Sequence, residues 1–390
     1  MWFFRAPTIV FGEDALLHIR ELRGKKAFVV TDKTLSAQRL IAPVLIQLER
    51  AGMAIETYDA VESEPGLETI ESGADRMSVS EPDWIVAVGG GSVLDAAKAM
   101  WVLYENPELE LEQVSPLEPI TLRERARLIA VPTTAGTGSE ATWAFEVTLE
   151  EDGVTRKFGS GHPSAMPDYA IVDPVMSASM PLDLRAASGM DALTQAIEGY
   201  LSNWSNDFTD GLCLVATKLV FEHLQRAIDD PTDREVGERM ANAASLAGLG
   251  YINSMVGLAH AMGRALGAAL NLSHGCVAGM CLPYVLEYYA RADGGARCAD
   301  IVRFLGDSAP DDPGACHVLA DRVRTLARAI GLPLKLTDAG VDETSFANAL
   351  PHLLDVAMSD TVIFTSPRQP DDEDLRKLFQ CVFSGEAVDF

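Results

Sequence analysis

The chain has 390 residues and a formal net charge of -26, and both numbers restrict its function. The negative charge argues against nucleic acid and anionic membrane surfaces as partners, because both require clustered Lys and Arg side chains. The length exceeds that of one ordinary hydrophobic core and predicts two domains. The six cysteines show no CxxC spacing and the sequence shows no secretion signal, so we expect reduced thiols in a cytoplasmic protein.

The first half of the chain alternates short apolar runs with stretches of helical periodicity. Strands that alternate with helices indicate βαβ units and a parallel sheet. A polar hairpin is expected over residues 145–158. The expected strands are 25–31, 54–58, 84–88, 127–131 and 169–172, and the expected helices are 35–51, 67–77 and 93–104.

Strand patterns almost disappear after Pro181, and helical stretches continue from there to the last residues. A change of this kind marks a domain boundary. We therefore predict an α/β dinucleotide-binding domain with a Rossmann-like parallel sheet at residues 1–180. An all-helical domain, residues 181–390, is expected to follow it.

One apolar stretch of the second half, residues 244–275, is rich in small residues yet contains His260 and His274. Asn253 and Arg264 also interrupt it, so a pair of buried helices is favoured over a membrane span. A buried imidazole needs a polar partner, because an unsatisfied polar group is costly in a protein interior. Either a metal ion or a hydrogen bond within the core would provide that partner.

The turn after the expected strand 84–88 consists of Gly89, Gly90, Gly91 and Ser92. Glycine lets a phosphate approach the backbone, and the N-terminus of the following helix presents free N–H groups. The pattern differs from the GxGxxG fingerprint, and a tight strand-to-helix turn would also account for it.

Two further features favour a dinucleotide at this edge of the sheet. Asp32 ends the first expected strand, where a carboxylate would accept hydrogen bonds from a ribose diol and repel a 2′-phosphate. We therefore expect NAD rather than NADP. A second polar turn, residues 133–140 with the sequence TTAGTGSE, would supply hydroxyl and amide groups to the same ligand.

A carboxylate and an amide lie upstream of the two histidines. Asp191 and Gln195 are four residues apart and therefore share one face of an expected helix. His260 and Arg264 share a face of another helix, and His274 lies at the start of the next one. Two histidines with an upstream carboxylate favour a metal site over hydrogen-bonded core histidines.

Together these motifs resemble the iron-containing (group III metal-dependent) alcohol dehydrogenase family, which has the dehydroquinate-synthase-like fold. GGGSxxDxxK followed by TTAGTGSE is a specific combination, and the resemblance extends over nearly the whole chain. The segments that carry it are VFG (10–12), VVTDKTL (29–35), GGGSVLDAAKAM (89–100), VPTTAGTGSEAT (131–142), DYAIVDP (168–174), SGMDALTQAIEGY (188–200), GLAHAMGRALG (257–267), HG (274–275) and SPR (366–368).

For the cofactor, the resemblance implies a nicotinamide dinucleotide. Asp32 would hold the adenosine ribose, and the glycine-rich turn would hold the pyrophosphate with Asp95 close by. The other residues that the resemblance places along the cofactor are Thr133, Thr134, Thr137, Ser139 and Lys157. The family also implies a small alcohol or aldehyde substrate and a homodimer or larger assembly.

For the metal, the resemblance places Asp191, His260 and His274 at three of four ligand positions. The ion, Fe2+ or Zn2+, would polarise the alcohol or aldehyde oxygen while the nicotinamide exchanges hydride with the carbon. The fourth position, a histidine in the family, is Gln195 here, and an amide oxygen is a poorer ligand than imidazole. A second family histidine is replaced by Arg264, which is not an acid or base near neutral pH but binds carboxylates.

Three interpretations remain open at this stage. The favoured one is a metal-dependent dehydrogenase or aldehyde reductase that uses Asp191, Gln195, His260 and His274 as ligands. His260 and Arg264 would then be its catalytic residues, with Arg264 selecting an anionic substrate. In the second, the metal is absent and Arg264 or Lys157 polarises the carbonyl. In the third, the chain is a catalytically silent nucleotide-binding subunit, although the intact cofactor motifs count against that.

Overall fold

A computed structural model describes residues 3–151, 154–291, 295–308 and 311–390, without the side chains of residues 150–157, 312 and 313. The chain divides into two compact units, Met1–Met180 (unit 1) and Pro181–Phe390 (unit 2). Unit 1 contains a parallel sheet with helices, and unit 2 is helical throughout its described residues, so the predicted fold class is confirmed. Among the described residues, no helix is long and apolar enough to span a membrane.

The sheet of unit 1 has six parallel strands in the order β1-β8-β5-β4-β2-β3. Five of them coincide with the expected strands to within a few residues. β1 is not predicted, because this edge strand has only four residues and none of them is fully buried. The strands are β1 (Thr8–Phe11), β2 (Lys26–Asp32), β3 (Ala54–Val61), β4 (Trp84–Gly89), β5 (Arg127–Pro132) and β8 (Tyr169–Val172).

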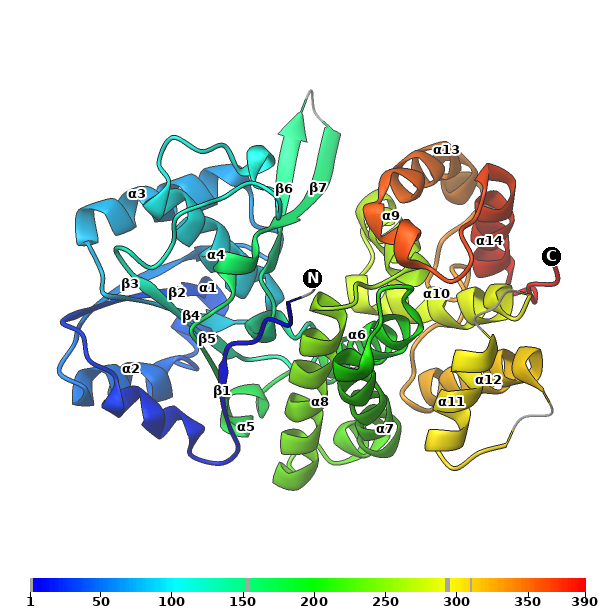
Figure 1. The fold of residues 1–390 in the computed structure, drawn as a ribbon, viewed down its shortest axis with the longest axis horizontal. Coiled ribbons are helices and arrows are strands. Elements are labelled where there is room, and N and C mark those ends of the chain that lie inside the picture. The colour runs from blue at the N-terminus through cyan, green and yellow to red at the C-terminus, as the bar shows by residue number, and fades with distance from the viewer. Residues whose placement is uncertain (1–2, 152–153, 292–294, 309–310) are drawn as a thin grey trace. The chain divides into compact units, whose positions relative to one another are not determined.

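Helices cover both faces of this sheet (Figure 1). Side chains alternate along each strand, so Phe28 and Val30 of β2 pack into a core with α3 and α4, while Ala27 and Val29 pack into a second core with α2. Strands that are buried on both faces explain the continuous apolar runs of the sequence. The helices of unit 1 are η1 (Ala15–Glu21), α1 (Lys33–Ala37), α2 (Ala42–Arg50), α3 (Leu67–Ser80), α4 (Gly91–Glu105), η2 (Leu111–Gln113), η3 (Ser139–Ala141), η4 (Pro163–Ala165) and α5 (Pro174–Ser177).

Two further expectations for unit 1 concern the helical stretch after β2 and the hairpin. The single helix expected over residues 35–51 is wrong, because the structure has α1 and α2 there, separated by Arg39 with a φ of 59°. Pro43 in the first turn of α2 suits a helix start but not a helix interior. The expected hairpin is confirmed as β6 (Ala144–Glu151) and β7 (Val154–Gly161), which project from the unit in Figure 1.

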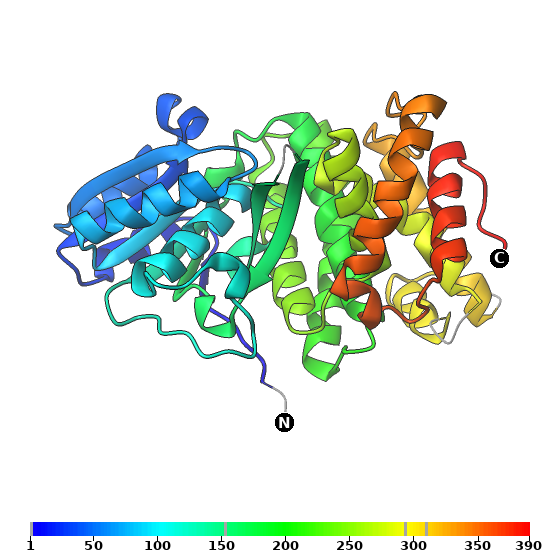
Figure 2. The same ribbon diagram turned by 90° about the horizontal axis from the view of Figure 1, so that it is seen from above.

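Unit 2 is a bundle of helices (Figure 2). Within it, α6 packs against α7, α8 and α10. Every residue from Arg185 to Leu201 of α6 is buried, so the polar side chains of this helix need partners inside the protein. The helices are α6 (Leu182–Leu201), α7 (Asp207–Asp229), α8 (Arg234–Ile252), α9 (Leu258–Leu270), α10 (His274–Tyr289), α11 (Gly295–Phe304), α12 (Asp312–Ala329), α13 (Glu343–Ser359), η5 (Thr361–Thr365) and α14 (Asp372–Ser384).

The small-residue stretch 244–275 forms the end of α8, all of α9 and the start of α10, rather than only a pair of helices. Met255 and Asn271, both with positive φ, lie at the two breaks. These breaks allow α9 and the start of α10 to present different residues to α6. The two histidines therefore come from different helices, as expected.

Candidate cofactor and metal sites

In unit 1, three chain segments with predicted cofactor residues lie at neighbouring strand ends. Asp32 ends β2, Gly89 ends β4 and Pro132 ends β5, and Gly89 pairs with Pro132 in the strand register. Because the strands are parallel, their carboxyl ends share one edge of the sheet, where open α/β sheets bind ligands. The topology thus brings the two polar turns of the sequence together.

The two turns touch each other, and the glycines make this contact possible. A Cβ atom at Gly91 would lie 2.8 Å from Thr137 Cγ2, and one at Gly90 would lie 3.2 Å from Thr134 Cγ2. α4 begins at Gly91 with Gly90 as its N-cap, and no side chain of the cap bonds to the helix. The first N–H groups of α4 are consequently suited to a phosphate. Ser92 is engaged elsewhere, because its hydroxyl donates to the Ser63 carbonyl at 2.5 Å.

Asp32 has a structural role in addition to the predicted one. Its Oδ1 atom accepts a hydrogen bond from the Leu35 backbone N–H at 2.8 Å and so caps α1. The side chain is partly exposed at the edge of the sheet where the glycine turn also lies. The capping of α1 is by itself a sufficient reason for an aspartate at position 32. The assignment of Asp32 to the ribose therefore remains a prediction.

Asp95 and Ser139 belong to a buried polar network around Lys98, a residue that the sequence analysis does not select. Lys98 is fully buried, and its Nζ atom contacts Ser139 Oγ at 2.6 Å and Asp95 Oδ1 at 3.3 Å. It also bonds to Thr142 Oγ1 at 3.0 Å and to the Ala144 carbonyl at 2.8 Å. The ammonium group therefore ties α4 to the second polar turn and to β6.

Burial and pairing act in opposite directions on these charges. Burial raises the pKa of Asp95, and its attraction to Lys98 and its hydrogen bond from Ser139 oppose that rise. Burial likewise lowers the pKa of Lys98, against the attraction of Asp95. The sequence signal for Lys98 is a lone cation on the otherwise apolar helix AAKAMWVL, three residues after Asp95.

The remaining predicted cofactor residues lie on the same turn or on the hairpin. Thr133 is buried, and its backbone N–H donates to the Gly89 carbonyl at 2.9 Å. Thr137 Oγ1 accepts from the Ser139 N–H at 3.3 Å, and Thr134 faces Gly90. Lys157 pairs with Thr148 across the hairpin, but its side chain lies outside the described part of the chain.

In unit 2, three of the four predicted metal ligands converge. One ligand atom each of Asp191, His260 and His274 lies within 4.8 Å of the other two. Asp191 Oδ1 is 3.5 Å from His260 Nε2 and 3.8 Å from His274 Nε2. The residues come from α6, α9 and the first position of α10, so helix packing assembles the group.

A glycine permits the close approach of α10 to α6. A Cβ atom at Gly275 would lie 2.4 Å from the Ala187 carbonyl oxygen and 3.0 Å from Asp191 Cβ. No larger residue fits this space without moving the backbone, and His274 directly precedes it. The HG pair of the sequence therefore has a steric reason at this position.

Gln195 lies beside Asp191, as the four-residue spacing predicts. Its Nε2 atom donates to Asp191 Oδ2 at 3.1 Å. Asp191 Oδ1, Gln195 Oε1 and His260 Nε2 are buried atoms that have no hydrogen-bond partner among the described residues. Buried polar atoms rarely stay unsatisfied, and an oxygen, oxygen and nitrogen donor set suits a divalent cation. The residues present therefore fit a metal ion.

Glu198, seven residues after Asp191, completes this group and is not selected from the sequence. Its carboxylate contacts His260 Nδ1 at 2.5 Å and is almost completely buried. Burial lowers the pKa of His260, but the neighbouring carboxylates of Asp191 and Glu198 outweigh burial and raise that pKa to about 9. The available signal is the spacing of residues 191, 195 and 198, which places three polar side chains on one face of a buried helix.

Arg264 lies one turn after His260 on α9. Its Nη1 atom donates to Asp360 Oδ2 at 2.9 Å, and 28% of its side chain is exposed. Asp360 also caps η5 by accepting from the Val362 N–H. This ion pair gives Arg264 a structural role that the sequence analysis does not predict, and its role towards the substrate remains a prediction.

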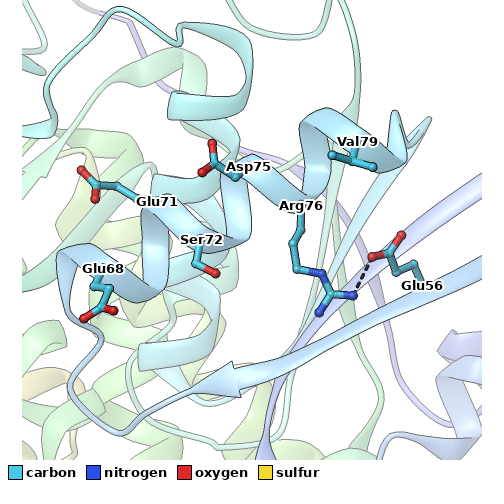
Figure 3. A pocket seen from close by; sticks show the side chains of 7 residues that line it. All are labelled: Glu56, Glu68, Glu71, Ser72, Asp75, Arg76 and Val79. Atoms are coloured by element: carbon cyan, nitrogen blue, oxygen red, sulfur yellow. Dashed lines mark hydrogen bonds and ion pairs between the residues drawn. The ribbon is translucent and has the colours of Figure 1, made fainter.

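A surface pocket of unit 1 contains none of the predicted site residues (Figure 3). It lies along α3 and β3, where Arg76 Nη2 pairs with Glu56 Oε1 at 2.6 Å. Its other acidic side chains follow one face of an exposed helix, which is typical of a solvated surface. The lining residues are Glu56, Glu68, Glu71, Ser72, Asp75, Arg76 and Val79.

Comparisons with known proteins identify the family of the chain. Residues 6–174 match the family "Iron-containing alcohol dehydrogenase", and residues 185–383 match "Fe-containing alcohol dehydrogenase family, C-terminal". The chain is 34% identical to the NADPH-dependent butanol dehydrogenase of Clostridium saccharobutylicum over all of both proteins. It is 34% identical to the lactaldehyde reductase of Escherichia coli (strain K12), with 97% of this chain and 96% of the relative covered.

Solved structures and longer relatives give the same result. The iron-containing alcohol dehydrogenase of Thermococcus thioreducens superimposes with a TM-score of 0.90 at 29% identity, covering 99% of this chain and 100% of that one. The chain spans about half the length of bifunctional aldehyde-alcohol dehydrogenases, such as 43% of the Escherichia coli (strain K12) protein at 33% identity. The chain therefore belongs to the iron-containing alcohol dehydrogenase family, and its activity class is alcohol dehydrogenase or aldehyde reductase.

Proposed function

We propose that the protein transfers hydride between NAD(H) and a small alcohol or aldehyde with the help of one divalent metal ion, Fe2+ or Zn2+. The convergence of Asp191, His260 and His274 in unit 2, beside buried atoms without hydrogen-bond partners, carries this proposal. Asp191, Gln195, His260 and His274 would hold the ion. Once bound, the metal supplies a Lewis acid for the substrate oxygen, and the nicotinamide supplies or accepts the hydride.

The side chains and backbone of this chain would bind the cofactor and orient the metal ligands. The N-terminus of α4 and the two touching turns would bind the pyrophosphate through backbone N–H groups. Lys98 keeps these turns together through its contacts with Asp95 and Ser139. In unit 2, Glu198 and Gln195 orient the ligands His260 and Asp191.

The preference for NAD over NADP is the finer part of the proposal. Asp32 at the end of β2 supports it, because a carboxylate repels a 2′-phosphate. The NADPH-dependent relative argues for the other cofactor. Initial rates with NADH and NADPH and a series of short aldehydes test both the activity and the preference. Higher kcat/KM with NADH supports the proposal, and equal or higher kcat/KM with NADPH contradicts the cofactor assignment.

We propose further that Arg264 favours an anionic substrate, because its guanidinium is partly exposed one turn from His260. The test compares an acidic and a neutral aldehyde of equal size in the wild type and in Arg264→Ala. A larger rise of KM for the acidic aldehyde supports this role. An equal change for both substrates would assign Arg264 to its ion pair with Asp360 alone, and Asp360→Asn is the matched control. A homodimer or larger assembly, checked by light scattering, completes the proposal.

A further inference from the structure

A buried carboxylate outside the ligand set connects two of the metal-binding helices. Glu198 of α6 accepts hydrogen bonds from the backbone N–H groups of Gly257 at 3.0 Å, Ala259 at 2.6 Å and His260 at 3.3 Å. These donors belong to the N-cap and the first turn of α9, and the N-cap residue Gly257 provides no side chain of its own. Glu198 therefore caps α9 from a different helix.

The same carboxylate determines which nitrogen of the His260 ring carries a proton when the ring is neutral. Glu198 Oε2 lies 2.5 Å from His260 Nδ1. An ionised carboxylate only accepts hydrogen bonds, so Nδ1 carries the proton and donates it. The other ring nitrogen, Nε2, has no hydrogen-bond partner among the described residues and lies 3.5 Å from Asp191 Oδ1. With the Nδ1 proton held by Glu198, Nε2 is the ring nitrogen that becomes unprotonated when a metal binds, and it faces the ligand group.

The space around Glu198 leaves little room for rearrangement. The residue is 2% exposed, and a Cβ atom at Gly257 would lie 3.2 Å from Glu198 Oε1 and 3.0 Å from Ser366 Oγ. Two turns of α6 separate Glu198 from Asp191, and both side chains contact His260. Helix α6 thus places Asp191 beside Nε2 of the imidazole and Glu198, which accepts the hydrogen bond, beside Nδ1.

From these contacts we propose that Glu198 is the positioning residue of the metal centre, which holds His260 in the ligand orientation and strengthens its imidazole as a ligand. This inference rests on the proposed metal-dependent function. Carboxylates that accept a hydrogen bond from a metal-bound histidine raise its basicity, and their loss weakens metal binding by about 10- to 100-fold. Glu198 does not bind the metal itself in this account.

The test measures Zn2+ affinity of the full-length, metal-stripped protein by competition with a chromophoric chelator. Glu198→Gln preserves shape and an acceptor oxygen but removes the charge. We expect Zn2+ binding to weaken by about 10- to 100-fold in this variant. The matched control is Glu287→Gln on α10, because Glu287 is also a buried carboxylate with one side-chain and one backbone donor. The control should bind Zn2+ like the wild type.

Each outcome separates this inference from the function it rests on. If wild type and Glu198→Gln bind Zn2+ equally, Glu198 is a helix cap only, and the metal-dependent function stands. If the wild type binds no metal, the proposed metal site and this inference are both overturned. Should Glu198→Gln not fold, ¹⁵N–¹H spectra of histidine-labelled wild type with Zn2+ decide. A proton on His260 Nδ1 supports the proposal, and a proton on Nε2 contradicts it.

Discussion

The candidate site of unit 1 and that of unit 2 differ in how far their buried polar groups are hydrogen-bonded. In unit 1, Lys98 has acceptors for all of its hydrogens, and Asp32 caps a helix. In unit 2, ligand atoms of Asp191, His260 and His274 converge. Asp191 Oδ1, His260 Nε2 and Gln195 Oε1 have no hydrogen-bond partner among the described residues. The difference agrees with the proposed roles: in unit 1 the side chains stabilise the turns and the backbone would bind the cofactor, whereas in unit 2 the side chains would bind the metal directly.

The largest expected effect tests the scaffold of unit 1. Lys98→Met leaves Asp95 without its cation, and breaking a buried pair in this way costs about 3–5 kcal/mol. We expect the free energy of unfolding, measured in urea, to fall by that amount and the KM for the nicotinamide cofactor to rise. The control Lys218→Met removes an exposed pair with Glu222 and should change stability by less than about 1 kcal/mol. Equal effects of the two substitutions would contradict the scaffold role of Lys98.

A steric substitution tests the assembly of the ligands in unit 2. Gly275→Ala places a methyl group 2.4 Å from the Ala187 carbonyl and must displace the start of α10, which carries His274. We expect metal affinity to drop about 100-fold, since a displacement near 1 Å is enough to disturb a metal site. Isothermal titration with Zn2+ measures this loss.

Gly237 provides the matched control for that substitution. It lies in α8, and a Cβ atom there has no neighbour within 4 Å. Gly237→Ala should leave metal binding unchanged and raise stability by about 0.5–1 kcal/mol, because glycine is costly within a helix. If both glycine variants bind metal like the wild type, the close approach at Gly275 has no role in the site.

The pH dependence of metal binding tests whether His260 in unit 2 loses a proton to the solvent when the metal binds. In the metal-free protein the pKa of His260 is about 9, so the imidazole is protonated at neutral pH and must lose a proton when a metal binds. Affinity should therefore increase about tenfold per pH unit below pH 9 and level off above it. A pH-independent affinity between pH 6 and 8, measured in buffers that do not bind Zn2+, would contradict the release of a proton from His260 on metal binding.

The smallest expected effect concerns Asp32. Asp32→Ala removes the cap of α1 and should cost about 1 kcal/mol of stability. It should also lower the ratio of kcat/KM for NADH to that for NADPH. Asp342→Ala removes an equivalent cap from α13 in unit 2 and should reduce stability without changing this ratio. The same ratio in both variants would leave Asp32 with its capping role alone.

Much of unit 1 is predictable because its strands are buried on both faces and therefore form continuous apolar runs. β1 is not, since an edge strand with partly exposed residues has no such run. The break between α1 and α2 lies at Arg39, whose residue type gives no signal for a positive φ, although Pro43 does indicate that a new helix starts there. The helices and strands of unit 1 are thus predictable where burial alone determines the order of apolar and polar residues.

The residues of the candidate sites also divide into those that the sequence predicts and those that it does not. Asp191, His260 and His274 are identified by their family motifs, and the structure brings them together. Lys98 and Glu198 stand within the family motifs but are not assigned a role, because each lies within an apolar helix and the sequence does not reveal its partners. Their partners, Gly257 to His260 and residues 139–144, become neighbours only when the tertiary fold forms.

The metal content of the protein is the most direct test of the proposed metal site in unit 2. Elemental analysis is performed on protein purified without oxygen and without chelator, in the wild type and in Gln195→Ala. The account predicts about one Fe or Zn per wild-type chain, and less in the variant, because the buried Gln195 oxygen then no longer completes the ligand set. A wild-type protein that contains no metal, yet oxidises NADH with an aldehyde, would contradict the account.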